Sequence, residues 1–140
     1  MRRLPALLCA PLCALALAAC GTTVSTAGFT GEKHAVAQTI SNLQAAATAA
    51  EQKKICAEYL AAAAVTRLGG TKGCEAAIKS QLTEVDSLEV TVESVAVATG
   101  GKSASARVKS VHEGKKALST LPLVKEGGKW KVSGAGTSAG

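Results

Sequence analysis

The chain has 140 residues and a net charge of +6, from 16 basic and 10 acidic side chains. Its single Phe, single Tyr and single Trp provide too few aromatic rings for a surface that stacks bases, so we exclude nucleic-acid binding. The length suits one domain with one modest core.

The first twenty residues have the pattern of a bacterial export signal. Residues 1–3 carry two arginines, and residues 4–17 form an apolar run without charge. Residues 17–20, Leu-Ala-Ala-Cys, resemble the lipobox of bacterial lipoproteins. This resemblance implies that residues 1–19 are removed as a signal peptide. It also implies that Cys20 is acylated and anchors the protein at the extracytoplasmic face of the cell membrane.

Two other interpretations of this segment remain. Residues 16–18, Ala-Leu-Ala, also fit an ordinary signal-peptidase site, which would give a freely secreted protein. The segment could instead stay as an anchor, although its apolar run is shorter than the ~20 residues of a spanning helix.

The remaining cysteines predict a disulfide. Of five cysteines, Cys9 and Cys13 leave with the signal and Cys20 carries the lipid, so Cys56 and Cys74 form an even pair in an oxidising compartment. Both align with apolar residues at helical spacing, which points their sulfurs into the core from neighbouring helices. A structural bridge is the favoured interpretation; two free buried thiols or a redox pair are the alternatives.

The N-terminal half of the remaining chain predicts a tether followed by three helices. Residues 20–31 are rich in Gly, Thr and Ser and predict a flexible tether, after which the domain extends over residues 32–133. An apolar stripe marks the first helix; its members are Val36, Ile40, Leu43 and Ala47. Residues 48–51, Thr-Ala-Ala-Glu, match a capping box and predict a break before a second helix.

The second helix is expected to bury one face and to reach about residue 68. That face consists of Ile55, Cys56, Tyr59, Leu60 and Ala63. Residues 69–73 contain three glycines and predict a loop, and residues 74–82 predict a short third helix.

After residue 83 the hydrophobic period changes from helical to two, which predicts strands. The alternation slips at Ser94, which indicates a bulge, and Pro122 indicates an edge or bulge position in a later strand. In the last strand, Trp130 and Val132 are expected to point inward, and residues 134–140 are expected to be a disordered tail. The predicted class is α+β, with about three helices packed on a curved antiparallel sheet of about four strands.

The pattern resembles small NTF2-like lipoprotein domains, particularly a lumazine-binding-like group of actinobacteria, over about residues 33–133. The resemblance depends on residues 55–60 (Ile-Cys-Ala-Glu-Tyr-Leu), on residues 67–70 (Arg-Leu-Gly-Gly) followed by Cys74, and on residues 121–132 (Leu-Pro-Leu-Val-Lys-Glu-Gly-Gly-Lys-Trp-Lys-Val). It implies a curved sheet wrapped over helices as a cone that can be hollow, and it implies no particular function.

Catalysis is not expected, because the candidate acid–base groups do not form a recognisable set. Asp86, Tyr59, His34 and His112 are scattered along the chain, without a serine elbow, paired carboxylates or a metal-ligand cluster. Residues 96–103 match a relaxed phosphate-loop pattern, but a strand rather than a helix follows, so a hairpin turn explains them and no nucleotide is expected. We expect no cofactor and no metal.

The sequence therefore favours a non-catalytic binding or interaction module. A small apolar ligand would lie between helices and sheet, against Ile40, Leu43, Tyr59, Val90, Val108, Leu123 and Trp130. The alternatives are a filled cone that binds an envelope protein through its surface and, less favoured, an isomerase or dehydratase of the NTF2-like type.

The charge distribution suggests a second contact. Residues 100–140 hold eight basic and two acidic side chains. A face carrying Arg107, Lys109, Lys129 and Lys131 could contact anionic headgroups or wall polymers, although lysines that merely keep the domain soluble explain the same pattern.

Overall fold

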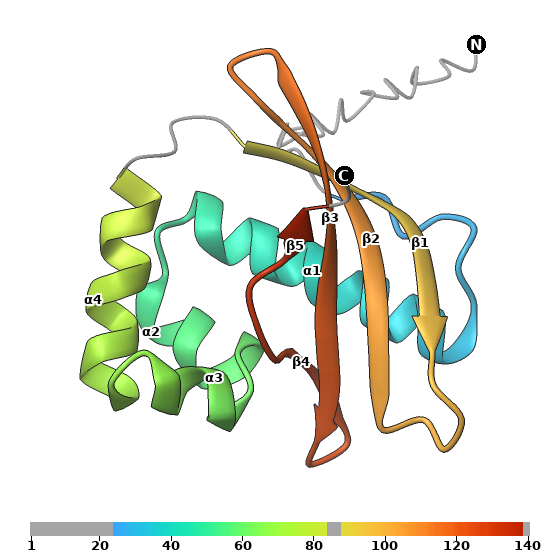
Figure 1. The fold of residues 1–140 in the computed structure, drawn as a ribbon, viewed down its shortest axis with the longest axis horizontal. Coiled ribbons are helices and arrows are strands. Elements are labelled where there is room, and N and C mark those ends of the chain that lie inside the picture. The colour runs from blue at the N-terminus through green and yellow to red at the C-terminus, as the bar shows by residue number, and fades with distance from the viewer. Residues whose placement is uncertain (1–23, 84–87, 139–140) are drawn as a thin grey trace, which may run out of the picture.

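The computed structural model describes residues 24–83 and 88–138, which form four α-helices, one short π-helix and a five-stranded antiparallel sheet (Figure 1). All helices precede all strands along the chain, so the predicted α+β class is confirmed. The predicted export signal and Cys20 lie outside the described residues. Within the described ranges, no helix is long and apolar enough to cross a bilayer.

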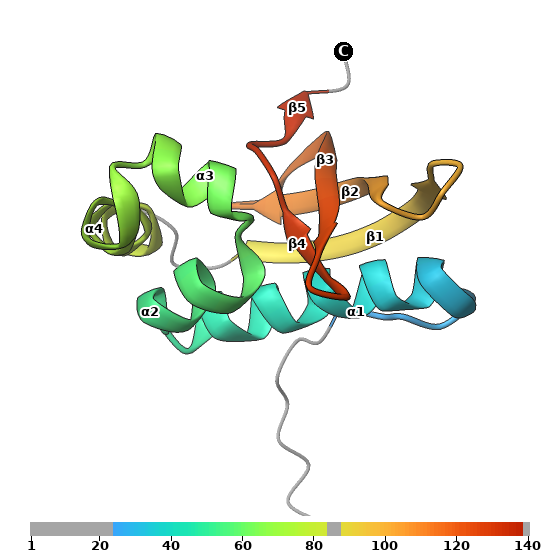
Figure 2. The ribbon, with the colours of Figure 1, turned by 90° about the horizontal axis from the view of Figure 1, so that it is seen from below.

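Helix α1 (Gly31–Thr48) lies across the inner face of the sheet (Figure 2). Val36 and Ile40 of the predicted stripe are buried, because they pack against the strands. Val24, ahead of the helix, is only 5% exposed and belongs to the same core. The prediction of a free tether is therefore wrong at Val24 and at Phe29, which packs against the same core, while other residues of this segment are exposed.

The break after α1 occurs where the sequence predicts it. Ala50 adopts a left-handed conformation (φ 54°), and α2 (Gln52–Lys54) follows. The capping box itself is wrong: the Thr48 hydroxyl donates to the Gln44 carbonyl (3.0 Å), and no side chain caps α2. The backbone reversal at Ala50, rather than a side-chain cap, ends the first helix.

The second helix is interrupted, contrary to prediction. The π-helix η1 (Ile55–Tyr59) stops at Leu60, which is extended, and the Ala61 amide donates to the Val132 carbonyl (2.8 Å). Helix α3 (Ala62–Arg67) begins after this contact with the sheet. The Ala61 amide thus donates to β4, whereas in a continuous helix it would donate to a carbonyl of the preceding turn.

The interruption changes which residues of this region are buried. Ile55 and Cys56 are buried as predicted, whereas Ala63 on α3 is exposed. The Glu126 carboxylate accepts a hydrogen bond from the Ala62 amide (3.2 Å) at the start of α3. A side chain from the sheet thus supplies a partner at the N-terminus of this short helix.

Helix α4 (Gly70–Thr83) starts four residues earlier than predicted, so the expected loop over residues 69–73 is wrong beyond Gly69. Gly69 has a φ of 90°, which lets the chain reverse in one step. A Cβ at Gly73 would lie 2.1 Å from the Leu68 carbonyl oxygen, so this turn closes only around a glycine. The glycines therefore make a tight turn into a helix.

The sheet is an antiparallel meander in the order β1-β2-β3-β4, with β5 paired to β3. Its strands are β1 (Leu88–Val97), β2 (Ser103–His112), β3 (Lys115–Glu126), β4 (Lys129–Val132) and β5 (Thr137–Ser138). The register of β1 against β2 shifts between Val92 and Ser94, which confirms the predicted bulge. The predicted disordered tail is wrong for residues 137–138, because they pair with Ser119 and Thr120.

Pro122 occupies a gap in the hydrogen-bond ladder. Its carbonyl accepts from the Ser133 amide (2.9 Å), just beyond the end of β4, and β5 pairs only with Ser119 and Thr120. Any other residue at this position would direct its backbone N–H toward the same side of β3, where no strand residue pairs with it. The predicted edge or bulge position is therefore wrong: β3 has β2 on one side and β4 and β5 on the other, its register with β2 is regular at Pro122, and the proline fits because it falls between the segments that pair with β4 and β5.

Alternation along the strands divides the sheet into two faces. Ala104, Ala106 and Val108 of β2 are buried on the inner face, as predicted, and so are Trp130 and Val132 of β4. These residues and α1 form the core (Figure 2). Helix α4 contributes no residue to this core cluster.

Candidate functional site

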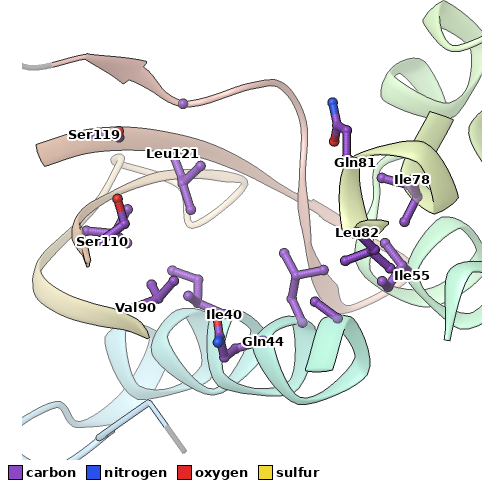
Figure 3. Close-up of a pocket in the computed structure, with 14 residues that line it drawn as sticks. Ile40, Gln44, Ile55, Ile78, Gln81, Leu82, Val90, Ser110, Ser119 and Leu121 are labelled. Carbon is purple, nitrogen blue, oxygen red and sulfur yellow. The ribbon is translucent and has the colours of Figure 1, made fainter. Parts of the chain in front are cut away.

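A cavity of about 370 Å³ lies between α1, α4 and the inner face of the sheet (Figure 3). Strands β1, β2 and β3 form one wall, α1 forms the floor, and η1 and α4 form the opposite wall. Its lining residues are Ile40, Leu43, Gln44, Ala47, Ile55, Ile78, Gln81, Leu82, Val90, Val108, Ser110, Ser119, Leu121 and Gly136.

The lining is aliphatic and uncharged. None of these fourteen residues is aromatic, acidic or basic. The polar members are two amides and two hydroxyls: Gln44, Gln81, Ser110 and Ser119. Gln44 is buried at 7% exposure, and the Ser110 hydroxyl lies 3.5 Å from the Ala117 carbonyl, to which it donates. Such a surface favours removal of aliphatic groups from water and offers no acid–base pair for catalysis.

A disulfide fixes one wall of the cavity. Cys56 in η1 is bonded to Cys74 in α4, with 6.1 Å between their Cα atoms and both residues buried. The predicted pairing is confirmed. Ile78 and Leu82 follow Cys74 at helical spacing on α4 and face the cavity (Figure 3). The bond therefore holds the helix that carries them.

The structure separates the predicted pocket residues into two groups. Ile40, Leu43, Val90 and Val108 line the cavity, as predicted. Leu123 does not; it is 1% exposed and packs within the core.

Tyr59 and Trp130, also predicted for the pocket, lie at a different place. Both line a second groove, of about 380 Å³, on another side of α1, whose walls include His34 and Lys129. This groove is mixed in polarity. The expectation that Tyr59 and Trp130 line the same pocket as Ile40 and Leu43 is wrong, because the two aromatic residues take no part in the lining of the aliphatic cavity.

Trp130 is held by a polar contact at the start of α1. Its ring is 4% exposed, and its indole N–H donates to the Glu32 carboxylate (2.7 Å). Lys125 donates to the other oxygen of that carboxylate (2.6 Å) and lies 5.6 Å from the indole ring centre. The hydrogen bond from Lys125, with that from Trp130, lowers the pKa of Glu32. These contacts join β3 and β4 to α1.

The cavity includes residues that the sequence did not single out. Gln44 lies on α1 between Leu43 and Ala47 of the predicted stripe, and Ile78 and Leu82 lie on α4 one and two turns after Cys74. Gly136 came from the expected tail. Its backbone is so close to β3 that a Cβ would lie 3.1 Å from both Leu121 Cδ2 and Ser119 Cβ. Its place in the lining depends on this segment lying alongside β3, which no sequence pattern indicates.

The four predicted surface cations share the outer face of the sheet. By strand register, Arg107 and Lys109 of β2 and Lys129 and Lys131 of β4 all alternate with inner-face residues. Arg107 lies 3.9 Å from Glu93, and the Lys131 ammonium donates to the Ala57 carbonyl (3.1 Å). The face is basic, but these two cations already have partners within the domain.

The described residues contain no group of three or more His, Cys, Asp or Glu side chains that could hold a metal ion. Asp86 lies outside the described ranges. No known protein family, curated protein or solved structure matches the chain. Its function must therefore be argued from the cavity itself.

Proposed function

We propose that this chain is a lipid-anchored protein of the extracytoplasmic membrane face whose domain binds a small apolar ligand without catalysis. The observation that carries the proposal is the aliphatic cavity of about 370 Å³ between α1, α4 and the sheet. The lipobox-like residues 17–20 support the location. The finer fold assignment, an NTF2-like cone, is part of the same proposal.

The size and chemistry of the cavity support a ligand over a filled interior. Small-molecule sites are typically concave, 300–1,000 Å³ in volume, and mostly apolar with a few placed polar groups. A domain with one Phe, one Tyr and one Trp has few large side chains to fill such a space. The Cys56–Cys74 bond joins η1 to α4 within one wall, so this wall is held in place before a ligand arrives.

Filling part of the cavity should weaken ligand binding. Ala47 lines it from α1 and is half-buried, so Ala47→Leu would occupy space equal to about three ligand methylene groups. At roughly 0.8 kcal/mol per methylene, the affinity should fall on the order of 10- to 100-fold. The measurement is displacement of an apolar fluorescent probe by hexadecanol, using residues 21–140, which retain the described core, disulfide and cavity.

Ala45→Leu is the matched control. Ala45 lies on the exposed side of the same helix, so the added side chain should leave the affinity unchanged. Both variants should first show the disulfide by mass and a cooperative melting transition. Equal affinity in the wild type and Ala47→Leu, or failure of the wild type to bind hexadecanol or any other ligand with the same chain, would overturn the proposal of a ligand cavity.

Replacing Cys20 by Ala should release the protein from membranes, because the thioether to the lipid can form only on this thiol. The measurement is the partition of full-length protein between membrane and soluble fractions after export. Ser25→Ala, in the exposed residues ahead of α1, is a control that should remain in the membrane fraction. Unchanged membrane partition of Cys20→Ala would contradict lipid anchoring.

A further inference from the structure

The inner face of the β2–β3 hairpin changes polarity in one direction, starting within the cavity. In register, Ala106 opposes Leu121, and the next inner-face pair is Val108 with Ser119. Further toward the hairpin tip come Ser110 with Ala117, and then His112 with Lys115. The same face therefore runs from aliphatic, through hydroxyl, to cationic.

Exposure follows the same order. Ala106 and Val108 are buried, Ser110 and Ser119 are half-buried at the cavity wall, and Lys115 is exposed. Two residues of strand separate Ser110 from His112, a rise of about 7 Å. A ligand whose tail fills the cavity would thus pass the two hydroxyls and end beside a cation.

We propose that the ligand is an aliphatic amphiphile with an anionic head group, whose chain occupies the cavity while Ser110, Ser119 and Lys115 contact the polar end. This inference rests on the proposed function. The absence of aromatic rings from the lining favours a flexible aliphatic chain over a flat ring system, and the absence of charge within it places the charged group outside.

Lys115 is the residue that gives the preference for a negative charge. It shares the inner face with Ser119 by the alternation of β3, whereas its neighbour Lys116 belongs to the outer face with Lys109 and Leu118. Glu113, in the turn itself, is the carboxylate at the tip, and Lys115 and Lys116 both follow it. The two lysines therefore differ in face while sharing charge, exposure and position in the hairpin.

The test compares ligands that share one chain length. Palmitate and hexadecyl phosphate below their micelle-forming concentrations, and hexadecanol below its solubility limit, are tested for displacement of an apolar probe from residues 21–140 and from the variants Lys115→Ala and Lys116→Ala. Inorganic phosphate without a chain is measured beside them. We expect both anionic ligands to bind the wild type more tightly than hexadecanol does, and added salt to weaken only their binding. Inorganic phosphate should displace nothing.

Lys115→Ala should lower the affinity for palmitate and for hexadecyl phosphate by about 1.5- to 5-fold, as expected for loss of a solvent-exposed charge pair. The affinity for hexadecanol should not change. Lys116→Ala should change none of the three. Three outcomes would each overturn the amphiphile assignment. The two lysine variants could lose the same affinity for the anionic ligands, Lys115→Ala could lose as much affinity for hexadecanol as for palmitate, or inorganic phosphate alone could displace the probe. Binding of hexadecanol without binding of palmitate would also overturn it but leave the apolar cavity function intact. Failure of all three chains to bind would remove both.

Discussion

Replacing Trp130 with alanine should lower the free energy of unfolding by about 3–5 kcal/mol, the usual cost of deleting a buried large aromatic side chain. The ring is 4% exposed and packs in the main core, and its N–H donates to Glu32 at the start of α1. The substitution removes both the packing and the contact that joins β4 to α1. Denaturant unfolding followed by circular dichroism measures the loss.

Trp130→Phe and Glu32→Gln separate these two contributions. Trp130→Phe keeps most of the buried area, and because Trp130 lies outside the lining of the aliphatic cavity, the hexadecanol affinity of this variant should remain unchanged. Equal stability of Trp130→Ala and wild type would contradict the placement of the ring in the core. A loss of ligand affinity in a fully folded Trp130→Phe would contradict its exclusion from the cavity.

Glu32→Gln reports on the ionic part through pH. Because the pKa of Glu32 is lowered in the folded state, its stabilising contribution is complete above the ordinary carboxyl pKa. That contribution is lost as pH falls through the folded-state value. The free energy of unfolding of the variant should therefore fall less steeply at acid pH than that of the wild type. The difference in this free energy between the two proteins should be greatest at neutral pH.

Removing the disulfide should have the second large effect. The bond closes a loop with a sequence separation of 18, for which chain entropy gives about 3 kcal/mol of stabilisation. In Cys56→Ser/Cys74→Ser, α4 would lose its covalent attachment to η1, and Ile78 and Leu82 would no longer be held at the cavity. We therefore expect a lower melting temperature together with weaker hexadecanol binding.

Reduction of the wild type by a thiol reagent should reproduce both effects, and re-oxidation should restore them. A double serine variant with lower stability but unchanged affinity at a temperature where it is folded would show that packing alone holds α4. Unchanged melting would show that the loop is already restricted in the unfolded chain.

The β meander could be predicted because its signals are local. Alternation of apolar and polar residues, two-residue turns and the phase slip near Ser94 are each readable within ten residues, and the structure has them in the same places. The helical half was harder. Leu60 and Ala61 leave the helix because their backbone pairs with Val132 of β4. This partner lies about seventy positions away, and no residue near Leu60 indicates it.

The same distinction between local and distant signals applies to the cavity. Ile40, Leu43, Val90 and Val108 were recognised by their periodicity, since inward positions of α1 and the strands must face one another. The prediction for Tyr59 and Trp130 is wrong because the size and hydrophobicity of a ring do not indicate which of two grooves it lines. Gly136 could not be recognised, since its contribution is backbone position along β3 rather than side-chain chemistry.

The close approach of the Leu68 carbonyl to Gly73 has a consequence for how the Cys56–Cys74 disulfide forms. Gly73 directly precedes Cys74, and only a residue without a Cβ lets the Leu68 carbonyl approach so closely. In the reduced chain, closing this reversal brings Cys74 toward the segment that carries Cys56. We therefore expect a residue with a Cβ at position 73 to slow formation of the bond.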